Sequence, residues 1–127
     1  MTRFSDIVMD HFDSPRNRGH MLDCHATGQG SFGGGPPRVT IFLRSRLTCV
    51  ESATFEAEGC GVTIACASRL TELVIGKPLN ACRELVPECL MAELGGLPAD
   101  KHYCAWIAIE ALRAALDHLP TASTSND

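Results

Sequence analysis

The chain has 127 residues, of which 45% are hydrophobic, so its length and composition suit one globular domain with its own core. The net charge of −4 gives no reason to expect nucleic-acid binding, and no apolar run is long enough to span a membrane. In a reducing compartment, seven cysteines, an odd number, are better explained by metal binding, redox chemistry or packing than by a disulfide framework.

The N-terminal segment, which begins MTRFSD, lacks the apolar core of a signal peptide, so we expect a cytoplasmic protein. Apolar side chains recur every three or four residues over residues 4–12. This spacing predicts a short amphipathic helix, and Ser5 or Asp6 could cap its first turn. The turn-forming residues over 13–19 end it.

Residues 20–37 form the least regular stretch of the chain and are rich in glycine. Residues 28–33 read GQGSFG, which formally matches the GxGxxG pattern of dinucleotide-binding proteins. That pattern needs a preceding strand and a following helix, whereas here no strand is predicted before it and two prolines follow it. We therefore interpret residues 27–37 as a mobile loop, because ordering five glycines costs much backbone entropy.

Two strands are predicted next, over residues 39–43 and 49–58, joined through a turn at residues 46–48. A helix over residues 62–75 follows, with one apolar and one polar face, and Gly76-Lys77-Pro78 ends it.

The turn between the second strand and this helix places Cys60 between two glycines. Glycine suits a tight turn that leaves a sulfur exposed. A helix that starts just after Gly61 would direct its unpaired N–H groups toward Cys60 and favour the thiolate, the form that binds metals and attacks sulfur. The alternative is a strand-to-helix turn with a small buried cysteine.

A further helix is predicted over residues 80–93, where Cys82 and Cys89 share one face and are expected to pack in the core. The last helix spans residues 101–119, and residues 120–127 form a polar tail that we expect to be disordered. The order of elements predicts an α+β fold, a small antiparallel sheet of two or three strands with helices packed on one face, in a single domain over residues 1–119.

Three positions could carry chemistry: Cys60, the His102–Cys104 cluster, and Cys66. Because Cys104 also opens a helix, two thiolates could converge on one metal with His102 as a nitrogen ligand, a donor set that suits zinc or iron. The alternative for His102 is an exposed loop histidine, and for Cys66, on a face that looks buried, a role in packing. We see no pattern of a hydrolase or another enzyme, and expect no catalytic residues.

Three segments carry a resemblance to a known family. Residues 10–17 read DHFDSPRN, residues 55–61 read FEAEGCG and precede the helix at 65–72, and residues 94–104 read LGGLPADKHYC. Over most of its length the chain resembles the NifU/IscU-type iron–sulfur cluster scaffolds, whose patterns include DHxxxPRN and LGGLPxxKxHC. The resemblance implies the α+β fold described above.

The resemblance also implies a function. Members of this family assemble a [2Fe–2S] cluster on three cysteines beside an aspartate, take sulfur from a cysteine desulfurase, and pass the cluster to apo-proteins; thiolates suit this cargo. Cys60 and Cys104 match the second and third cysteines, and residues 97–101 partly match a segment that binds an Hsp70-type chaperone.

The chain also departs from the family pattern. The family's first cysteine and its aspartate lie just before the first strand, where residues 33–38 read GGGPPR. Tyr103 replaces the histidine before the third cysteine, and His102 stands one place earlier. We therefore weigh a scaffold that holds a cluster or iron with a substitute ligand such as His102, Cys66 or Cys24 against two alternatives. These are a degenerate relative that binds zinc or a partner of the assembly machinery, and a carrier of persulfide sulfur.

Overall fold

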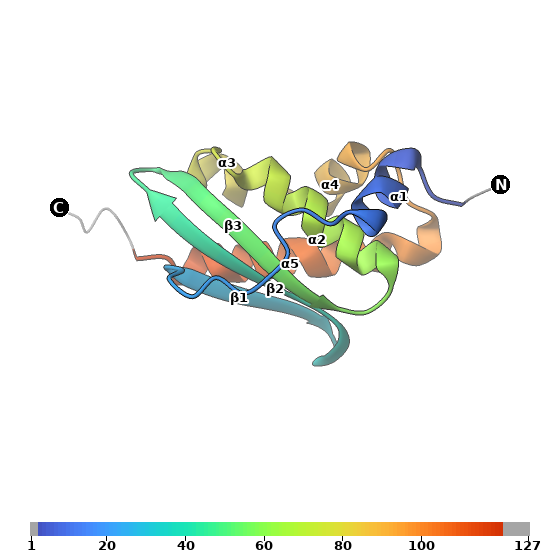
Figure 1. The fold of residues 1–127 in the computed structure, drawn as a ribbon, viewed down its shortest axis with the longest axis horizontal. Helices are drawn as coiled ribbons and strands as arrows, with labels where there is room; N and C mark the ends of the chain where they lie inside the picture. The colour runs from blue at the N-terminus through green and yellow to red at the C-terminus, as the bar shows by residue number, and fades with distance from the viewer. Residues whose placement is uncertain (1–2, 121–127) are drawn as a thin grey trace.

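The strands within residues 3–120 form one antiparallel sheet in the order β1-β2-β3. The computed structural model describes residues 3–120 and shows the helices packed against one face of this sheet, which confirms the predicted fold class (Figure 1). The elements are α1 (Asp6–Asp13), β1 (Ala26–Phe32), β2 (Gly35–Arg46), β3 (Cys49–Glu58), α2 (Gly61–Val74), α3 (Leu79–Arg83), α4 (Pro87–Glu93), the short 3-10 helix η1 (Ala99–Lys101) and α5 (His102–His118).

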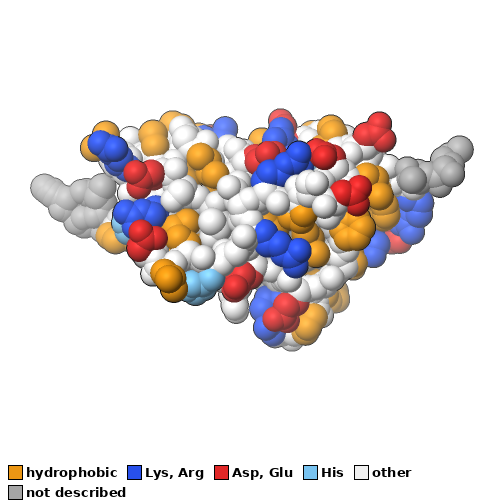
Figure 2. Space-filling view, in the orientation of Figure 1, with side chains coloured by type: hydrophobic (Ala, Val, Ile, Leu, Met, Phe, Trp, Pro, Cys, Tyr) orange, Lys and Arg blue, Asp and Glu red, His pale blue; other side chains and the backbone are white. Residues whose placement is uncertain are grey.

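The core lies between the sheet and the two long helices, α2 and α5. Alternate residues of β2 face this layer, and Val39, Ile41 and Leu43 are buried there. The segment between α1 and β1 crosses the sheet, with Arg18 bridged to Phe55 of β3. The face shown in Figure 2 carries interspersed acidic and basic side chains, as expected from the small net charge.

The prediction of a mobile loop over residues 27–37 is wrong, because residues 26–32 form strand β1 and strand β2 begins at Gly35. Along β1, Gly28 and Gly30 lie buried against α5. A Cβ on Gly28 would lie 2.1 Å from the backbone nitrogen of Ala115, and one on Gly30 would lie 2.1 Å from the carbonyl oxygen of Ile107. These two glycines of the GxGxxG match therefore let a helix approach a strand closely, which is the structural reason for their position.

The prediction of one helix over residues 80–93 is also wrong. This segment forms two helices, α3 and α4, separated by residues 84–86. Pro87 has no backbone N–H to donate and occupies the first turn of α4, where none is needed. The break separates two cysteines that were expected on one face: Cys82 is fully buried, whereas Cys89 is exposed.

The described part of the chain, residues 3–120, contains no helix that is both long and apolar enough to cross a membrane. The single domain predicted for residues 1–119 stays a prediction. Of the predicted polar tail, only Pro120 falls within the described residues.

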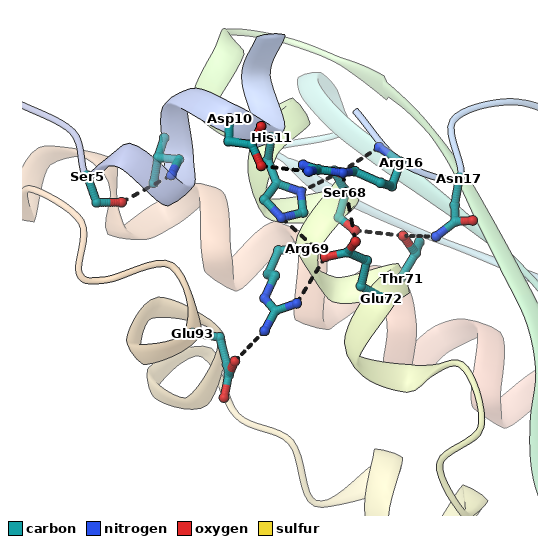
Figure 3. A network of polar contacts seen from close by, with 11 residues as sticks. Ser5, Asp10, His11, Arg16, Asn17, Ser68, Arg69, Thr71, Glu72 and Glu93 are labelled. Atoms are coloured by element: carbon teal, nitrogen blue, oxygen red, sulfur yellow. Dashed lines mark hydrogen bonds and ion pairs between the residues drawn. The ribbon is translucent and has the colours of Figure 1, made fainter. Parts of the chain in front are cut away.

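A buried polar network joins α1 to α2 (Figure 3). His11 is 4% exposed, and its Nδ1 lies 2.7 Å from the hydroxyl of Ser68 while its Nε2 lies 3.2 Å from Glu72. The Ser68 hydroxyl also accepts the backbone N–H of Arg16 at 2.9 Å, so a neutral His11 that accepts from Ser68 and donates to Glu72 gives both ring nitrogens a partner. Ser68 is itself fully buried, and its hydrogen bonds with His11 and Arg16 link α1 and the segment that follows it to α2.

We expect the stability of the protein to fall as the pH drops below about 6.5, the ordinary pKa of histidine. Burial is the main cause that lowers the pKa of His11, with Arg16 and Arg69 adding to it and Glu72 opposing it. Between the two pKa values the unfolded chain binds a proton that the folded chain does not, so unfolding becomes easier. Urea denaturation between pH 5 and 8 should show this loss in the parent and in His20→Gln, an exposed-histidine control. If the stability of His11→Gln falls with decreasing pH as steeply as that of the parent, His11 is not the cause of the loss.

Candidate functional site: two thiols around one hydroxyl

Cys60 lies at the turn from β3 into α2, as the sequence predicted, and is the N-cap residue of that helix. Gly59 precedes it with a φ of 148°, a conformation that favours glycine. Gly61 follows it and packs under the ring of Phe12, from which a Cβ would be only 2.5 Å away. The two glycines therefore allow the turn and the close approach of α1, and they leave the Cys60 thiol partly exposed.

Cys104 reaches the same place from the first turn of α5, which packs against α2. Its thiol is fully buried. The hydroxyl of Thr63 lies 3.6 Å from the sulfur of Cys60 and 3.5 Å from the sulfur of Cys104. The structure thus brings together two cysteines that are 44 residues apart, as their positions at two helix starts suggested.

The surroundings shift the pKa values of the two thiols in opposite directions. Partial burial raises the pKa of Cys60, but the backbone N–H and hydroxyl of Thr63, the N–H of Val62 and the charge of Lys101 together lower it from 9.0 to about 7. The Lys101 ammonium lies 3.8 Å from the Cys60 sulfur. Burial raises the pKa of Cys104, and the neighbouring Cys60 adds to this rise. Near neutral pH, Cys60 is therefore the thiolate of the pair.

We expect Cys60 to react with iodoacetamide with a pH midpoint of about 7. Lys101→Met and Thr63→Val should each move that midpoint upward, because each removes a group that stabilises the thiolate. Lys77→Met, a change at a lysine whose charge acts on Cys82, is the matched control and should leave the midpoint in place. Mass spectrometry of the Cys60 peptide gives the rates. An identical midpoint in the Lys101→Met protein would refute the role of that charge.

The other predicted donors lie elsewhere. The Nε2 of His102 lies 3.0 Å from the carbonyl oxygen of Leu97, and His102 lines a surface hollow beside Phe32 and Trp106. Cys66 is fully buried, consistent with packing, and burial raises its thiol pKa well above 9.0. Within residues 3–120, no three His, Cys, Asp or Glu side chains gather in an arrangement that could hold a metal ion.

The tip of the β1–β2 hairpin lies beside the thiol pair. The rings of Phe32 and Tyr103 are 5.8 Å apart, which joins the tip to the start of α5. A Cβ on Gly59 would lie 3.0 Å from the Cβ of Pro37. Pro37 lies two residues before the buried Val39 on β2, whereas a Cβ on Gly35 would meet no atom within 4 Å. The tip therefore brings Pro37, which has no metal-binding side chain, close to the turn that carries Cys60.

The sequence prediction missed Thr63, which contacts both sulfurs, and Lys101, which contacts the sulfur of Cys60. Each had a local signal. Thr63 occupies the third position of the helix that Cys60 caps, where an N–H faces the cap residue, and Lys101 stands three residues before Cys104. A groove of about 380 Å³ also leads to Cys60, and its apolar wall includes Phe4, Phe12 and Val8.

Comparison with known families and proteins identifies relatives of the chain. The family model of the NifU-like N-terminal domain matches residues 3–125. The chain is 36% identical over 115 residues to the iron–sulfur cluster assembly scaffold protein IscU of Aquifex aeolicus, which covers 89% of this chain and 73% of that protein. It is 33% identical over 118 residues to the scaffold protein IscU of Azotobacter vinelandii, with 89% and 91% covered.

Solved structures show the same fold. A NifU-like protein of Brucella abortus, described by its N-terminal part, superposes with a TM-score of 0.70 at 16% identity and covers 91% of this chain and 92% of that one. A protein assigned to iron–sulfur cluster assembly in the SUF system of Fervidobacterium islandicum AW-1 gives 0.71 at 19% identity, with 89% and 96% covered. At these identities the likeness concerns the fold alone.

Proposed function

Because the chain belongs to the NifU-like N-terminal domain family, we propose that it is an iron–sulfur cluster assembly scaffold that binds iron or a [2Fe–2S] cluster and passes it to acceptor proteins. The observation that carries the proposal is the meeting of Cys60 and Cys104 around the Thr63 hydroxyl. Clusters are held by cysteine thiolates, and this pair combines one accessible sulfur with one buried sulfur.

The cluster is the cargo of such a protein, and two thiols supply half of the four protein ligands that a [2Fe–2S] cluster takes. We propose His102 as a third donor, since histidine can replace cysteine on one iron of such a cluster. To bind the cluster, the His102 ring would give up its hydrogen bond with the carbonyl oxygen of Leu97. With water completing the shell, the same thiols would suit a zinc ion in the isolated protein.

The proposed partners follow from the cargo. A cysteine desulfurase would supply sulfur, apo iron–sulfur proteins would accept the cluster, and an Hsp70-type chaperone would bind residues 97–101, which lie partly exposed before α5. A scaffold of this kind acts by binding and transfer, and we propose that it does so in the cytoplasm without being an enzyme.

Anaerobic reconstitution with ferrous iron, L-cysteine and a cysteine desulfurase tests the proposal. The parent and Cys89→Ser, which changes an exposed thiol on α4, should gain cluster absorption and then load apo-ferredoxin. Cys60→Ser and Cys104→Ser should each fail in both steps. Loading by all four proteins alike would refute the proposal.

One observation favours a second candidate, a relative that binds zinc or a partner of the assembly machinery without building a cluster. Residues 33–37, which read GGGPP, place no sulfur or carboxylate beside the thiol pair. In that case the parent would bind zinc through Cys60 and Cys104 yet gain no cluster absorption in the reconstitution.

A further inference from the structure

A second pair of cysteines, Cys49 and Cys82, lies at the end of α2 away from Cys60, where β3 begins and α3 follows α2 (Figure 1). Cys49 is the first residue of β3 and forms an isolated antiparallel bridge with Pro78, which precedes α3. Backbone hydrogen bonds of 3.0 and 2.8 Å join the residues on either side of this bridge, and in such a pair the two Cα atoms stand about 4.5 Å apart. The start of β3 is therefore fixed against the residue from which α3 begins.

The sulfur of Cys82 points back toward this bridge. Cys82 lies one helical turn after Pro78, and its N–H donates to the carbonyl of Pro78 at 3.0 Å. Helical side chains lean toward the N-terminus of their helix, and the Cys82 sulfur accordingly lies 4.0 Å from the carbonyl oxygen of Lys77. The same oxygen accepts the N–H of Val50, the residue after Cys49. One carbonyl group thus contacts both Cys82 and the strand residue next to Cys49.

The two thiols differ in their access to solvent. Cys49 is partly exposed, whereas Cys82 is fully buried. Burial is the main cause that raises the pKa of Cys82, and the neighbouring Cys49 adds to the rise, while the charges of Lys77 and Arg83 oppose it. An oxidant that arrives from solvent therefore meets Cys49 first, and Cys82 reacts with what Cys49 has become.

The helix that carries Cys82 is short enough to adjust. Helix α3 has five residues, and within the described part of the chain no side chain caps its first turn. A disulfide needs its two Cα atoms within about 7 Å of each other. Because Pro78 holds the start of α3 beside Cys49, a shift of this one turn brings Cys82 into that range without moving the sheet.

We propose that Cys49 and Cys82 form a reversible disulfide when the protein meets a peroxide, a modification site separate from the Cys60–Cys104 pair. In a reducing compartment, disulfides of this kind are transient and report on oxidants. The bond would tie the start of β3 to α3 and close a loop that contains β3, the turn at Cys60 and α2. The inference goes beyond the scaffold function and does not depend on it.

Both steps balance with one peroxide as the oxidant. The Cys49 thiolate attacks one oxygen of hydrogen peroxide; the O–O bond breaks, the sulfur becomes a sulfenic acid, and the other oxygen leaves as hydroxide, which takes up the proton lost by Cys49. The Cys82 sulfur then attacks the Cys49 sulfur; the S–O bond breaks, and the departing hydroxide takes up the proton lost by Cys82. The two sulfurs lose two electrons, the peroxide gains two, and two molecules of water form.

Peptide mapping after peroxide treatment tests the pair. The reduced parent is exposed to hydrogen peroxide, its remaining thiols are blocked with N-ethylmaleimide, and it is digested without reductant. Trypsin combined with a glutamate-specific protease leaves Cys49 in the peptide 47–51, apart from Cys60 and Cys66. We expect this peptide to be linked to the one that contains Cys82, with the loss of two hydrogens, and dithiothreitol should reverse the link.

Variants separate the two steps. In Cys82→Ala the reaction should stop at a Cys49 sulfenic acid, which dimedone traps. Cys49→Ser, a change at a partly exposed position, should leave Cys82 reduced. Cys60→Ser/Cys104→Ser, which removes the thiols of the functional site, should form the link as the parent does. Cys24→Ser, at another partly exposed thiol, is the matched control and should also form it.

The link should depend on the folded structure, so we expect it to form at least about tenfold faster in the folded parent than in denaturing urea. Three results would overturn the proposal. The first is a Cys49 sulfenic acid that persists in the parent, and the second is a Cys49 peptide linked equally to Cys24, Cys66 and Cys89. The third is a link that forms no faster in the folded protein than in urea.

Discussion

Gly28→Ala and Gly30→Ala should each destabilise the protein by about 3 kcal/mol or more, at or above the upper end of what overpacking in a core costs. At either position a Cβ would stand 2.1 Å from a backbone atom of α5, a nitrogen at Ala115 or an oxygen at Ile107. A backbone atom cannot rotate away as a side chain can, so the helix must move off the sheet. Urea denaturation followed by circular dichroism measures the loss.

Gly35→Ala is the matched control for these variants. Among the described residues, no heavy atom outside its chain neighbours lies within 4 Å of a Cβ at this position, and Gly35 does not have the positive φ of Gly33 and Gly34. We expect its free energy of unfolding to change by less than about 0.5 kcal/mol. Equal stabilities of the Gly28→Ala, Gly30→Ala and Gly35→Ala proteins would show that α5 does not approach β1 as described.

Gly35→Cys/Pro37→Asp should raise cluster occupancy after anaerobic reconstitution from well below one to roughly one cluster per chain. The Cβ of Pro37 lies near Gly59, the residue before Cys60, and Gly35 has open space for a side chain. The double variant adds a thiolate and a carboxylate to the two thiols already present. Iron and acid-labile sulfide analysis, with absorption spectra, gives the occupancy.

The nearly isosteric pair Gly35→Ser/Pro37→Asn is the control, since it adds similar side chains without the thiolate and carboxylate. It should reconstitute no better than the parent. If the parent already holds a full, stable cluster, or if the control gains as much as the Cys/Asp variant, the hairpin tip is not the place where donors are lacking.

The sequence located both site cysteines through local rules. Cys60 stands between two glycines at a change from strand to helix, and Cys104 stands where a helix begins, so each helix start could be predicted without knowledge of the fold. The meeting of the two cysteines could not be predicted in this way. Thr63, which contacts both sulfurs, lies on α2, whereas Cys104 lies on α5, and the packing of these two helices is not a local feature. The His11–Ser68 contact, between residues 57 apart, was hidden for the same reason.

Strand β1 was missed because its inward-facing residues include Gly28 and Gly30, which carry no apolar side chain for a periodicity to detect. The remaining signal was the two-residue spacing of these glycines, which is the spacing of residues on one face of a strand. The single helix predicted over residues 80–93 ignored Pro87, although proline inside a helical pattern marks a boundary. Tertiary packing decided the structure of β1, and the backbone chemistry of Pro87 decided where α4 begins.

The most direct test of the Cys60–Cys104 site is an anaerobic zinc titration against a chromophoric chelator, comparing the parent with Cys60→Ala/Cys104→Ala. Loss of both thiolate ligands should weaken zinc binding on the order of 100-fold or more, while Cys49→Ala/Cys89→Ala, which spares the pair, should match the parent. If Cys60→Ala/Cys104→Ala binds zinc as tightly as the parent, the metal lies elsewhere and the two thiols are not the site.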